Sequence, residues 1–490
     1  MGRYLAQSSN LMKKWMLTIF LILMGIAVFL GITNQKEYFV AFLAAIFCVL
    51  LFFKTVLLVA QRTVHLGALK IWIALTIICV VIKGIWILKV RVPIAGDYSV
   101  FWGYAQSLAT HNTIYGGRYM ALFPHIFGYS SFLSWFVKVW GTSPMLGPVL
   151  NLLLTICSGS IIFRLCMRWF NLTAGAVGYL LWILCPSQTI YNSLILSEPL
   201  YTTLILAVLL VLTEAEVCTV LRSYPLFLAP AVGISCGVIL RLVNGVRPIA
   251  AVLVIALLIW VALLNTRKLL MQKWRRWWSL CIVCLLSTYF ILGPIWNQHI
   301  AERIGEEPSQ TPGYSFLVGF NPESGGRWNQ EDSDRLYYYS DQPGATAQWA
   351  QEQLLAEAEE RISSGEIDFA LLFIQKLRTF LGSDDTCVGY SSAVLRHTTL
   401  FSFLCNTFYY TAILLAIAGA IKLWKREENY LTLLAPLYVI GLTCAQMLVE
   451  VAGRYHYSIL PMLLMIGAGV AGGELSNKSP KNQSECQTLE

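Results

Sequence analysis

Long runs of apolar residues dominate the sequence, and short polar segments separate them. Most runs are close to the roughly 20 residues that an α-helix needs to cross a bilayer. Apolar and polar positions do not alternate within them, as they would in the strands of a membrane β-barrel. The pattern predicts an all-α polytopic membrane protein with about twelve transmembrane helices. We expect them at residues 15–33, 38–60, 69–89, 145–164, 172–186, 197–214, 225–243, 248–266, 279–296, 399–423, 430–449 and 456–473.

The composition agrees with this class. Apolar residues make up 57% of the 490 residues and charged residues only 13%, whereas soluble proteins carry about 25% charged residues. Most cysteines lie inside apolar runs without metal-ligand spacing, which indicates small buried side chains. Cys387 is the only cysteine well inside the large polar segment 297–398. A disulfide there would need Cys405 or another chain.

The basic residues predict the orientation. If the N-terminus is cytoplasmic, the short loops on the inner side carry most of the Lys and Arg, including those in 267–276 and 422–426. This asymmetry follows the positive-inside rule. The net charge of +8 is therefore a topology signal and does not indicate nucleic-acid binding. The polar segment 476–490 is expected to be a cytoplasmic tail.

Two long segments are then expected on the outer side. Residues 120–140 are apolar enough to span, but a span there would move every later basic loop outside, so we expect helices along the outer membrane face. The second segment is rich in polar residues, Gly and Pro and includes a predicted helix at 345–363. The expected division is two N-terminal helices (1–68), a transmembrane core (69–296) with the external loop 90–144, an external subdomain (297–398), three C-terminal helices (399–475) and the tail.

Ionisable residues from four distant segments are predicted on this same outer face. Each has an ordinary explanation as a solvated, helix-capping or snorkelling side chain. Their convergence on one face nevertheless predicts a shared site. The four sets are Asp97 with Arg118, Tyr119 and His125 in the first external loop; Glu198 at the start of the sixth span; Arg241 and Arg247 around the end of the seventh; and Glu450, Arg454, Tyr455 and His456 between the last two.

Several familiar catalytic motifs are missing from the sequence. It contains no P-loop and no HExxH zinc motif. The polar segments also offer no nucleotide-binding fold. If the protein is an enzyme, its activated substrate is therefore expected to arrive through the lipid.

The order of these features resembles the GT-C membrane glycosyltransferases, particularly the branch of protein O-mannosyltransferases and bacterial aminoarabinose transferases. The resemblance extends over roughly residues 70–475. The sequence departs from the family pattern in three ways. Two additional spans precede Asp97, the proline stretch holds only Pro124, and no basic residue lies between Tyr119 and Pro124. These departures leave the identity of the sugar and of the acceptor open. The matching segments are AGDYSVFWGYAQSLA, GGRYMALFPHIFGYSSFLSWFVKVWG, LSEPL, GISCGVILRLVNGVRP and GRYHYSILP.

The resemblance implies a polyprenyl-phosphate-linked sugar donor and an extracytoplasmic acceptor, either a cell-envelope glycan, a lipid or a protein. It implies Asp97 as general base and Glu198 as a second acid that orients the sugar or acceptor. A bacterial plasma membrane is the expected location. No metal ligand is assigned, no nucleic-acid partner is expected, and a divalent cation stays open as cofactor. Donor phosphate binding is assigned to Arg241, Arg247, Arg454 and His456, and acceptor or sugar binding to Arg118, Tyr119, His125 and Tyr455.

Two other functions fit the same features. An O-antigen ligase or polymerase type of enzyme also has about twelve spans and a large external loop with Arg and His, but it uses diphosphate-linked glycans. A lipid-linked sugar transporter would place ionisable groups near the bilayer midplane, on broken helices. The predicted position of these groups at the outer face argues against transport.

Overall fold

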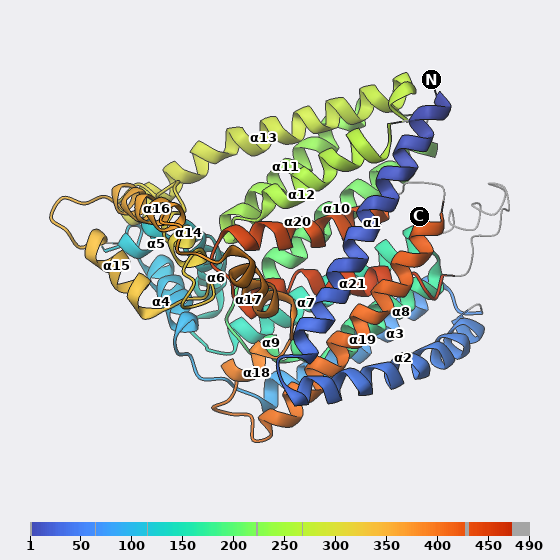
Figure 1. Cartoon of the computed structure of the whole chain (residues 1–490), viewed down its shortest axis with the longest axis horizontal. Helices are drawn as coiled ribbons and strands as arrows, with labels where there is room; N and C mark the ends of the chain where they lie inside the picture. The colour runs from blue at the N-terminus through green and yellow to red at the C-terminus, as the bar shows by residue number, and fades with distance from the viewer. Residues whose placement is uncertain are drawn as a thin grey trace.

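The computed structural model describes residues 2–63, 65–114, 116–221, 224–266, 268–426 and 431–472, and the regular elements within these ranges are helices (Figure 1). The predicted tail 476–490 and the basic residue Arg267 lie outside these ranges. In the described part, nine helices are long and apolar enough to cross a membrane. They are α1 (Gly2–Ile32), α2 (Lys36–Thr63), α3 (Ala68–Lys89), α7 (Leu146–Trp169), α10 (Glu198–Leu221), α11 (Leu228–Val246), α13 (Gln272–Ile304), α19 (Thr398–Lys425) and α20 (Leu434–Leu448).

Three shorter apolar helices coincide with the remaining predicted spans. These are α8 (Leu172–Leu184), α12 (Ala250–Ile259) with its π-helical extension Trp260–Leu264, and α21 (Ile459–Ala468). Helix α8 stops just before Pro186, because a proline disfavours helical geometry at the residue before it. Every residue of α21 is buried, so protein surrounds this helix. The predicted all-α polytopic membrane fold is confirmed.

Two spanning helices are much longer than predicted. Helix α1 begins at Gly2 and not near residue 15, and α13 covers 33 residues where 279–296 was expected. The extra turns are polar, so hydropathy cannot detect them, yet no residue there breaks a helix. Helix α13 even continues through Pro294. The polar C-terminal turns of α13, residues 297–304, belong to the second segment that was expected outside the membrane.

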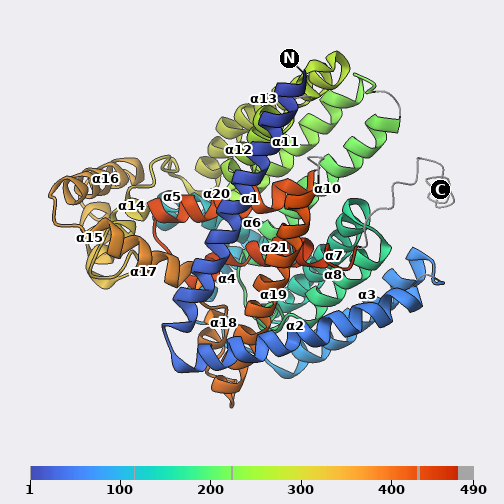
Figure 2. The same ribbon diagram turned by 45° about the vertical axis from the view of Figure 1, so that its right-hand side comes forward.

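The expected external segments form a second group of helices (Figures 1 and 2). Residues 120–140 are divided between two helices at Pro124, and the predicted helix 345–363 is present as α16. Helices α14 to α17 project from one end of the bundle, away from the N-terminus of the chain. The group comprises α4 (Asp97–Thr110), α5 (Arg118–Leu122), α6 (Pro124–Trp140), α14 (Gly313–Gly319), α15 (Gln330–Ser340), α16 (Ala347–Ser363), α17 (Phe369–Leu381) and α18 (Thr386–Tyr390). The short helix α9 (Pro186–Tyr191) lies outside these two segments, between α8 and α10.

Arg118 joins the first of these segments to the second. Its Nε lies 2.8 Å from a carboxylate oxygen of Glu306. Its two terminal nitrogens donate to the carbonyl oxygens of Ser340 at 2.9 Å and Ala345 at 2.7 Å. A planar guanidinium is suited to several fixed acceptors at once. These bonds fix α5 against residues 305–397, which we call the helical subdomain.

Lys376 on α17 anchors the helical subdomain to the end of α20. Its side chain is fully buried. Its Nζ donates to the carbonyl oxygens of Gly319, Met447 and Val449, each at 2.8 Å. The last carbonyls of a helix have no partner within the helix, so the ammonium group supplies the missing donors. The bonds attach α17 to the segment that follows α20.

Replacing Lys376 with Met is expected to destabilise the fold by about 1.5–3 kcal/mol, the typical contribution of hydrogen bonds to a charged group. Methionine preserves the length of the side chain but leaves the carbonyls of Gly319, Met447 and Val449 without this donor. The measurement is the thermal unfolding midpoint of the purified protein in detergent. Lys425→Met, at an exposed position on α19, is the control. An equal midpoint for the two variants would contradict the anchoring role.

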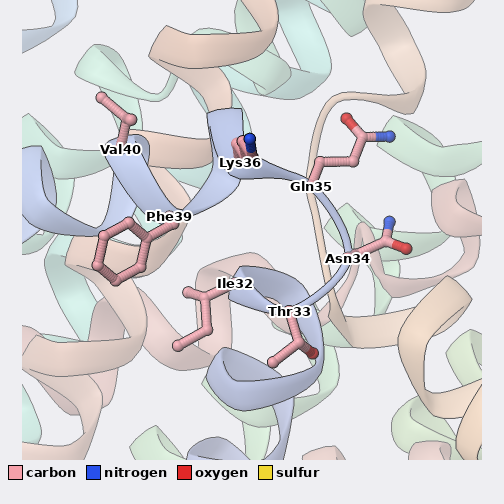
Figure 3. Close-up of a pocket in the computed structure, with 7 residues that line it drawn as sticks. All are labelled: Ile32, Thr33, Asn34, Gln35, Lys36, Phe39 and Val40. Carbon is pink, nitrogen blue, oxygen red and sulfur yellow. The ribbon is translucent and has the colours of Figure 1, made fainter.

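A hollow of about 520 Å³ lies at the turn between α1 and α2 (Figure 3). It is lined by residues 32–36 with Phe39 and Val40, all from one helical hairpin. Figure 3 shows Asn34 and Gln35 on the turn and Ile32 and Phe39 on the two helix ends. Lys36 is the only charged residue in this lining. The hollow therefore brings no set of reactive groups together.

Candidate functional site

Asp97, Glu198 and Arg454, from three distant parts of the chain, meet in the structure. Arg454 Nη1 lies 2.7 Å from Asp97 Oδ2, and Arg454 Nε lies 3.7 Å from Glu198 Oε1. The Asp97 side chain is 57% exposed, whereas that of Glu198 is only 2% exposed. One guanidinium thus bridges an accessible carboxylate and a buried one. We call these three residues with Arg247, Tyr455 and Glu450 the carboxylate–arginine cluster.

Gly96 sets the position of Asp97. Its φ of 55° lies in the left-handed region, which favours glycine over residues with a side chain. The chain turns there and enters α4, of which Asp97 is the first residue. Ser99 Oγ donates to the Gly96 carbonyl at 2.6 Å and closes this turn. The turn leaves the Asp97 carboxylate exposed beside Arg454, in the segment between α20 and α21.

Glu198 is held by a buried, non-helical segment between α9 and α10. Asn151 Nδ2 donates to the carbonyl of Leu194 at 2.6 Å, and Thr155 Oγ1 donates to Asn192 Oδ1 at 2.7 Å. Irregular backbone inside a membrane protein is tolerated where protein groups satisfy it. Asn151, on α7, satisfies the Leu194 carbonyl in this way, while Thr155, also on α7, fixes the side chain of Asn192. They fix the approach of the chain to Glu198, the first residue of α10.

A close crossing of α6 and α11 places two further predicted residues. A Cβ atom on Gly128 would collide with the carbonyl oxygen of Gly245. The two helices can therefore approach this closely only because Gly128 lacks a side chain. His125 lies one turn before this contact on α6, and Arg247 lies two residues after it. The crossing thus brings a histidine of the first external loop near an arginine of the bundle.

Arg247 stacks on Tyr455 and remains free of a carboxylate. Its guanidinium carbon lies 3.9 Å from the centroid of the Tyr455 ring. Among the described residues, no carboxylate oxygen comes within the 4.0 Å of an ion pair with Arg247. Arg454 lies over the same ring at 5.6 Å. The cluster therefore contains two neighbouring cations, only one of which is ion-paired, and this arrangement can accept an anion.

Glu450 and Tyr390 complete the surroundings of the two arginines. Tyr455 OH donates to Glu450 Oε1 at 3.3 Å. Burial raises the pKa of Glu450, while the charges of Arg247 and Arg454 oppose that change. The Tyr390 ring, on α18, lies 5.6 Å from the Arg454 guanidinium. The sequence placed Glu450 on this face without assigning it a role, and it offered no signal for Tyr390.

Tyr119 lies at the edge of this environment. Its side chain is half-buried, and its ring contacts Phe123 with a centroid distance of 5.1 Å. Burial raises the pKa of its hydroxyl, and the nearby charges of Asp97 and Glu450 add to the effect. The Tyr119 hydroxyl is therefore neutral and lies near enough to Asp97 and Glu450 to respond to their charges. Its predicted contact with acceptor or sugar stays a prediction.

Three other predicted site residues have different partners. Arg118 clamps the helical subdomain, as described above. Arg241 Nη2 donates to Gly293 O at 3.2 Å, on α13. His456 is buried and its Nε2 lies 3.0 Å from Asp384 Oδ1, with Ser187 Oγ bonded to the same carboxylate. His456 thereby fixes the turn that presents Arg454. The cluster does not include these three residues.

His125 is held neutral. Burial, together with the positive charges of Arg247 and Arg454, lowers its pKa to about 3. Between that value and the ordinary histidine pKa of roughly 6.5, the unfolded chain binds a proton at this residue and the folded chain does not. The free energy of unfolding therefore falls as pH falls through this window. Above it, the imidazole is neutral in both states and contributes no pH dependence.

Replacing His125 with Gln is expected to make the acid-induced loss of stability shallower below pH ~6.5. The check is the unfolding midpoint in detergent at a series of pH values from neutral to acid. His397→Gln, at an exposed position before α19, is the control. Parallel curves for the wild type and H125Q would show that His125 does not titrate differently on folding.

The described residues do not form a set of metal ligands. Within that part of the chain, no group of three or more His, Cys, Asp or Glu side chains is arranged to hold one. The Arg454 guanidinium lies between Asp97 and Glu198. In this structure the bridging cation of the cluster is therefore a side chain.

No protein-family model matches the sequence, and no curated protein matches it either. Among solved structures, the crystal structure of ArnT from Cupriavidus metallidurans bound to undecaprenyl phosphate shares 11% identity, covering 82% of this chain and 78% of that one, with a TM-score of 0.34. The apo structure of the same protein shares 13% identity over 83% and 78%, with a TM-score of 0.30. ArnT is an aminoarabinose transferase of the GT-C class that the sequence resembles. Because both TM-scores are low, the roles of the cluster residues have to be argued from the contacts of this chain itself.

Proposed function

We propose that the protein is a membrane glycosyltransferase that moves a sugar from a polyprenyl-phosphate-linked donor to an extracytoplasmic acceptor. One observation carries the proposal. The exposed carboxylate of Asp97 is paired at 2.7 Å with Arg454, and Arg247 lies on the neighbouring Tyr455 without an acid of its own. A base and an anion-binding group thus stand next to each other where the bundle meets the external segments.

In this proposal, Asp97 is the general base. The hydroxyl or amine of the acceptor attacks the anomeric carbon of the donor sugar, and its proton passes to an Asp97 carboxylate oxygen. Arg454 orients that carboxylate, and Glu198 holds Arg454 from the buried side. A base must reach the proton it removes within hydrogen-bond distance, and the exposure of Asp97 allows an acceptor to approach.

Arg247 would stabilise the leaving group. As the new bond forms at the anomeric carbon, the bond from that carbon to the phosphate oxygen breaks, and the polyprenyl phosphate leaves with an additional negative charge. A fixed guanidinium beside the leaving oxygen lowers the energy of this developing charge. His125, neutral and next to the arginines, can donate or accept a hydrogen bond there without adding charge.

The membrane would deliver the donor. Its isoprenoid chain can remain among the spanning helices while its phosphate reaches the end of the bundle. The positive-inside pattern supports an outer position for this end of the bundle, and the proposed location is a bacterial plasma membrane. The acceptor would then be a cell-envelope glycan, lipid or protein reaching the cluster past the helical subdomain.

The test uses purified protein in nanodiscs with a polyprenyl-monophosphate-linked sugar and a cell-envelope fraction as acceptor. Mass spectrometry should detect free polyprenyl phosphate together with the glycosylated acceptor. Turnover of diphosphate-linked glycans alone would support the O-antigen ligase type of enzyme instead. Passage of intact lipid-linked sugar across vesicles without cleavage would support a transporter. Either of these outcomes would overturn the proposed reaction.

A further inference from the structure

Another hollow, of about 730 Å³, lies between α13 and residues 307–310 and shares no lining residue with the carboxylate–arginine cluster. Arg241 lines it from α11, and Phe290 and Pro294 line it from α13. Glu307 and Gln310 line it from the segment that follows α13. The hollow thus begins at a spanning helix and ends at a polar segment.

The charge of Arg241 is not neutralised by the protein. Its side chain is half-buried, and its Nη2 makes two long hydrogen bonds, to Gly293 O at 3.2 Å and Asn297 Oδ1 at 3.3 Å. Its Nε is buried and has no hydrogen-bond partner. Among the described residues, no carboxylate oxygen lies within ion-pair distance of it. Arginine at membrane depth is costly unless it pairs with a suitable group, so the hollow offers a place for an anion.

The wall of the hollow on α13 is apolar at Phe290 and Pro294 and becomes polar at Asn297 and Gln298. Phe290 is 68% exposed, and Ile291 and Ile295 are 63% and 57% exposed on the same spanning helix. A hydrocarbon chain can therefore lie along α13 next to the hollow. Pro294 has no N–H, so the carbonyl of Phe290, four residues earlier, loses its helical donor. A polar acceptor is thus left at the boundary between the apolar wall and the guanidinium.

The other rim of the hollow carries the opposite charge. Glu307 and Gln310 are exposed there, and no ion pair engages Glu307 among the residues that the structure describes. A ligand with its phosphate next to Arg241 and its ammonium group next to Glu307 would match the charge at each rim. A primary ammonium has three N–H donors for the carboxylate and amide oxygens. A quaternary ammonium has none and is recognised instead by aromatic cages.

The geometry points to a binding site for a phospholipid whose phosphodiester is followed by a primary ammonium, the chemistry of a phosphatidylethanolamine headgroup. Arg241 binds the phosphodiester, Glu307 binds the ammonium, and an acyl chain lies along α13. This site is separate from that of the sugar donor. It does not depend on the proposed sugar transfer and can be measured without any sugar.

The experiment is native mass spectrometry of the full chain in micelles supplemented with phosphatidylethanolamine, phosphatidylcholine or phosphatidylglycerol. We expect the wild type to retain phosphatidylethanolamine about tenfold better than the other two, and R241Q to lose this retention by about tenfold, because a charge-assisted contact is removed. E307Q should still bind phospholipid but lose the preference for the primary ammonium. R275Q, at an exposed position near the other end of α13, and E359Q, exposed on α16, should match the wild type.

Three results would overturn the inference. Equal retention of the three lipids by the wild type would mean that lipid binding does not depend on the headgroup. Undiminished retention by R241Q would remove the phosphate contact. Displacement of phosphatidylethanolamine by an equal concentration of polyprenyl phosphate would show that the hollow is the donor's own site. The loss of sugar transfer in other variants would affect none of these measurements.

Discussion

The variant Asp97→Asn is expected to lower kcat for sugar transfer by roughly 10²–10⁴-fold, the usual contribution of a general base. Asparagine has nearly the same shape but cannot accept the acceptor's proton. The Asp97 side chain is 57% exposed, so the fold should tolerate the change. The measurement is the release of polyprenyl phosphate under single-turnover conditions, together with the unfolding midpoint of the same sample.

Asp334→Asn, at an exposed position on α15, makes the same chemical change elsewhere in the helical subdomain. It should turn over at the wild-type rate. Asp97→Glu should retain part of the activity, because the carboxylate is displaced but present. Full activity in D97N with an unchanged midpoint would rule out Asp97 as the base of the proposed reaction, whatever the sugar donor.

Removing Arg454 is expected to have the largest effect on stability. In Arg454→Gln, the side chain of Glu198, only 2% exposed, would lose its cation while Oε2 already lacks a hydrogen-bond partner. Breaking a buried ion pair in this way costs about 3–5 kcal/mol, because an uncompensated charge stays in a poorly solvated site. The readout is the thermal unfolding midpoint in detergent. Sugar transfer should also be lost, since Asp97 loses its partner.

The double variant E198Q/R454Q separates charge from packing. Removing both charges should recover most of the lost stability but none of the activity, because Asp97 still lacks its guanidinium. R275Q controls for the loss of one arginine at an exposed position. If the double variant is no more stable than R454Q alone, the pairing of Arg454 with Glu198 does not stabilise the fold.

Hydropathy predicted the spanning helices well because the bilayer imposes one requirement on each of them, a sufficient length of apolar side chains. The same requirement does not apply outside the hydrocarbon. The polar turns at the start of α1 and at the end of α13 therefore escaped detection. Helix α21 satisfies the apolar requirement but is wholly buried, which composition alone could not distinguish from exposure to lipid.

The sequence predicted on which membrane face the candidate site lies, but not which of its residues are in contact. Topology placed Asp97, Glu198 and Arg454 on one side, and the structure brings them together. It could not determine how each helix is rotated about its axis. Arg241 and Arg247 lie six residues apart on or just after α11, yet one faces α13 and the other faces Tyr455. Tertiary packing, which no local pattern encodes, decides between these directions.

The segment that carries Arg454 is also bound to the helical subdomain through its backbone. Glu450 N donates to Ser315 O at 2.8 Å, and Val451 N donates to Gly326 O at 2.9 Å. Gly319 packs so closely on Val449 that a Cβ atom would collide with it. In a chimera made with a protein of the same architecture, the subdomain therefore cannot be exchanged by itself. The α20–α21 hairpin has to be transplanted with it, and the two segments should vary together wherever this architecture has diversified.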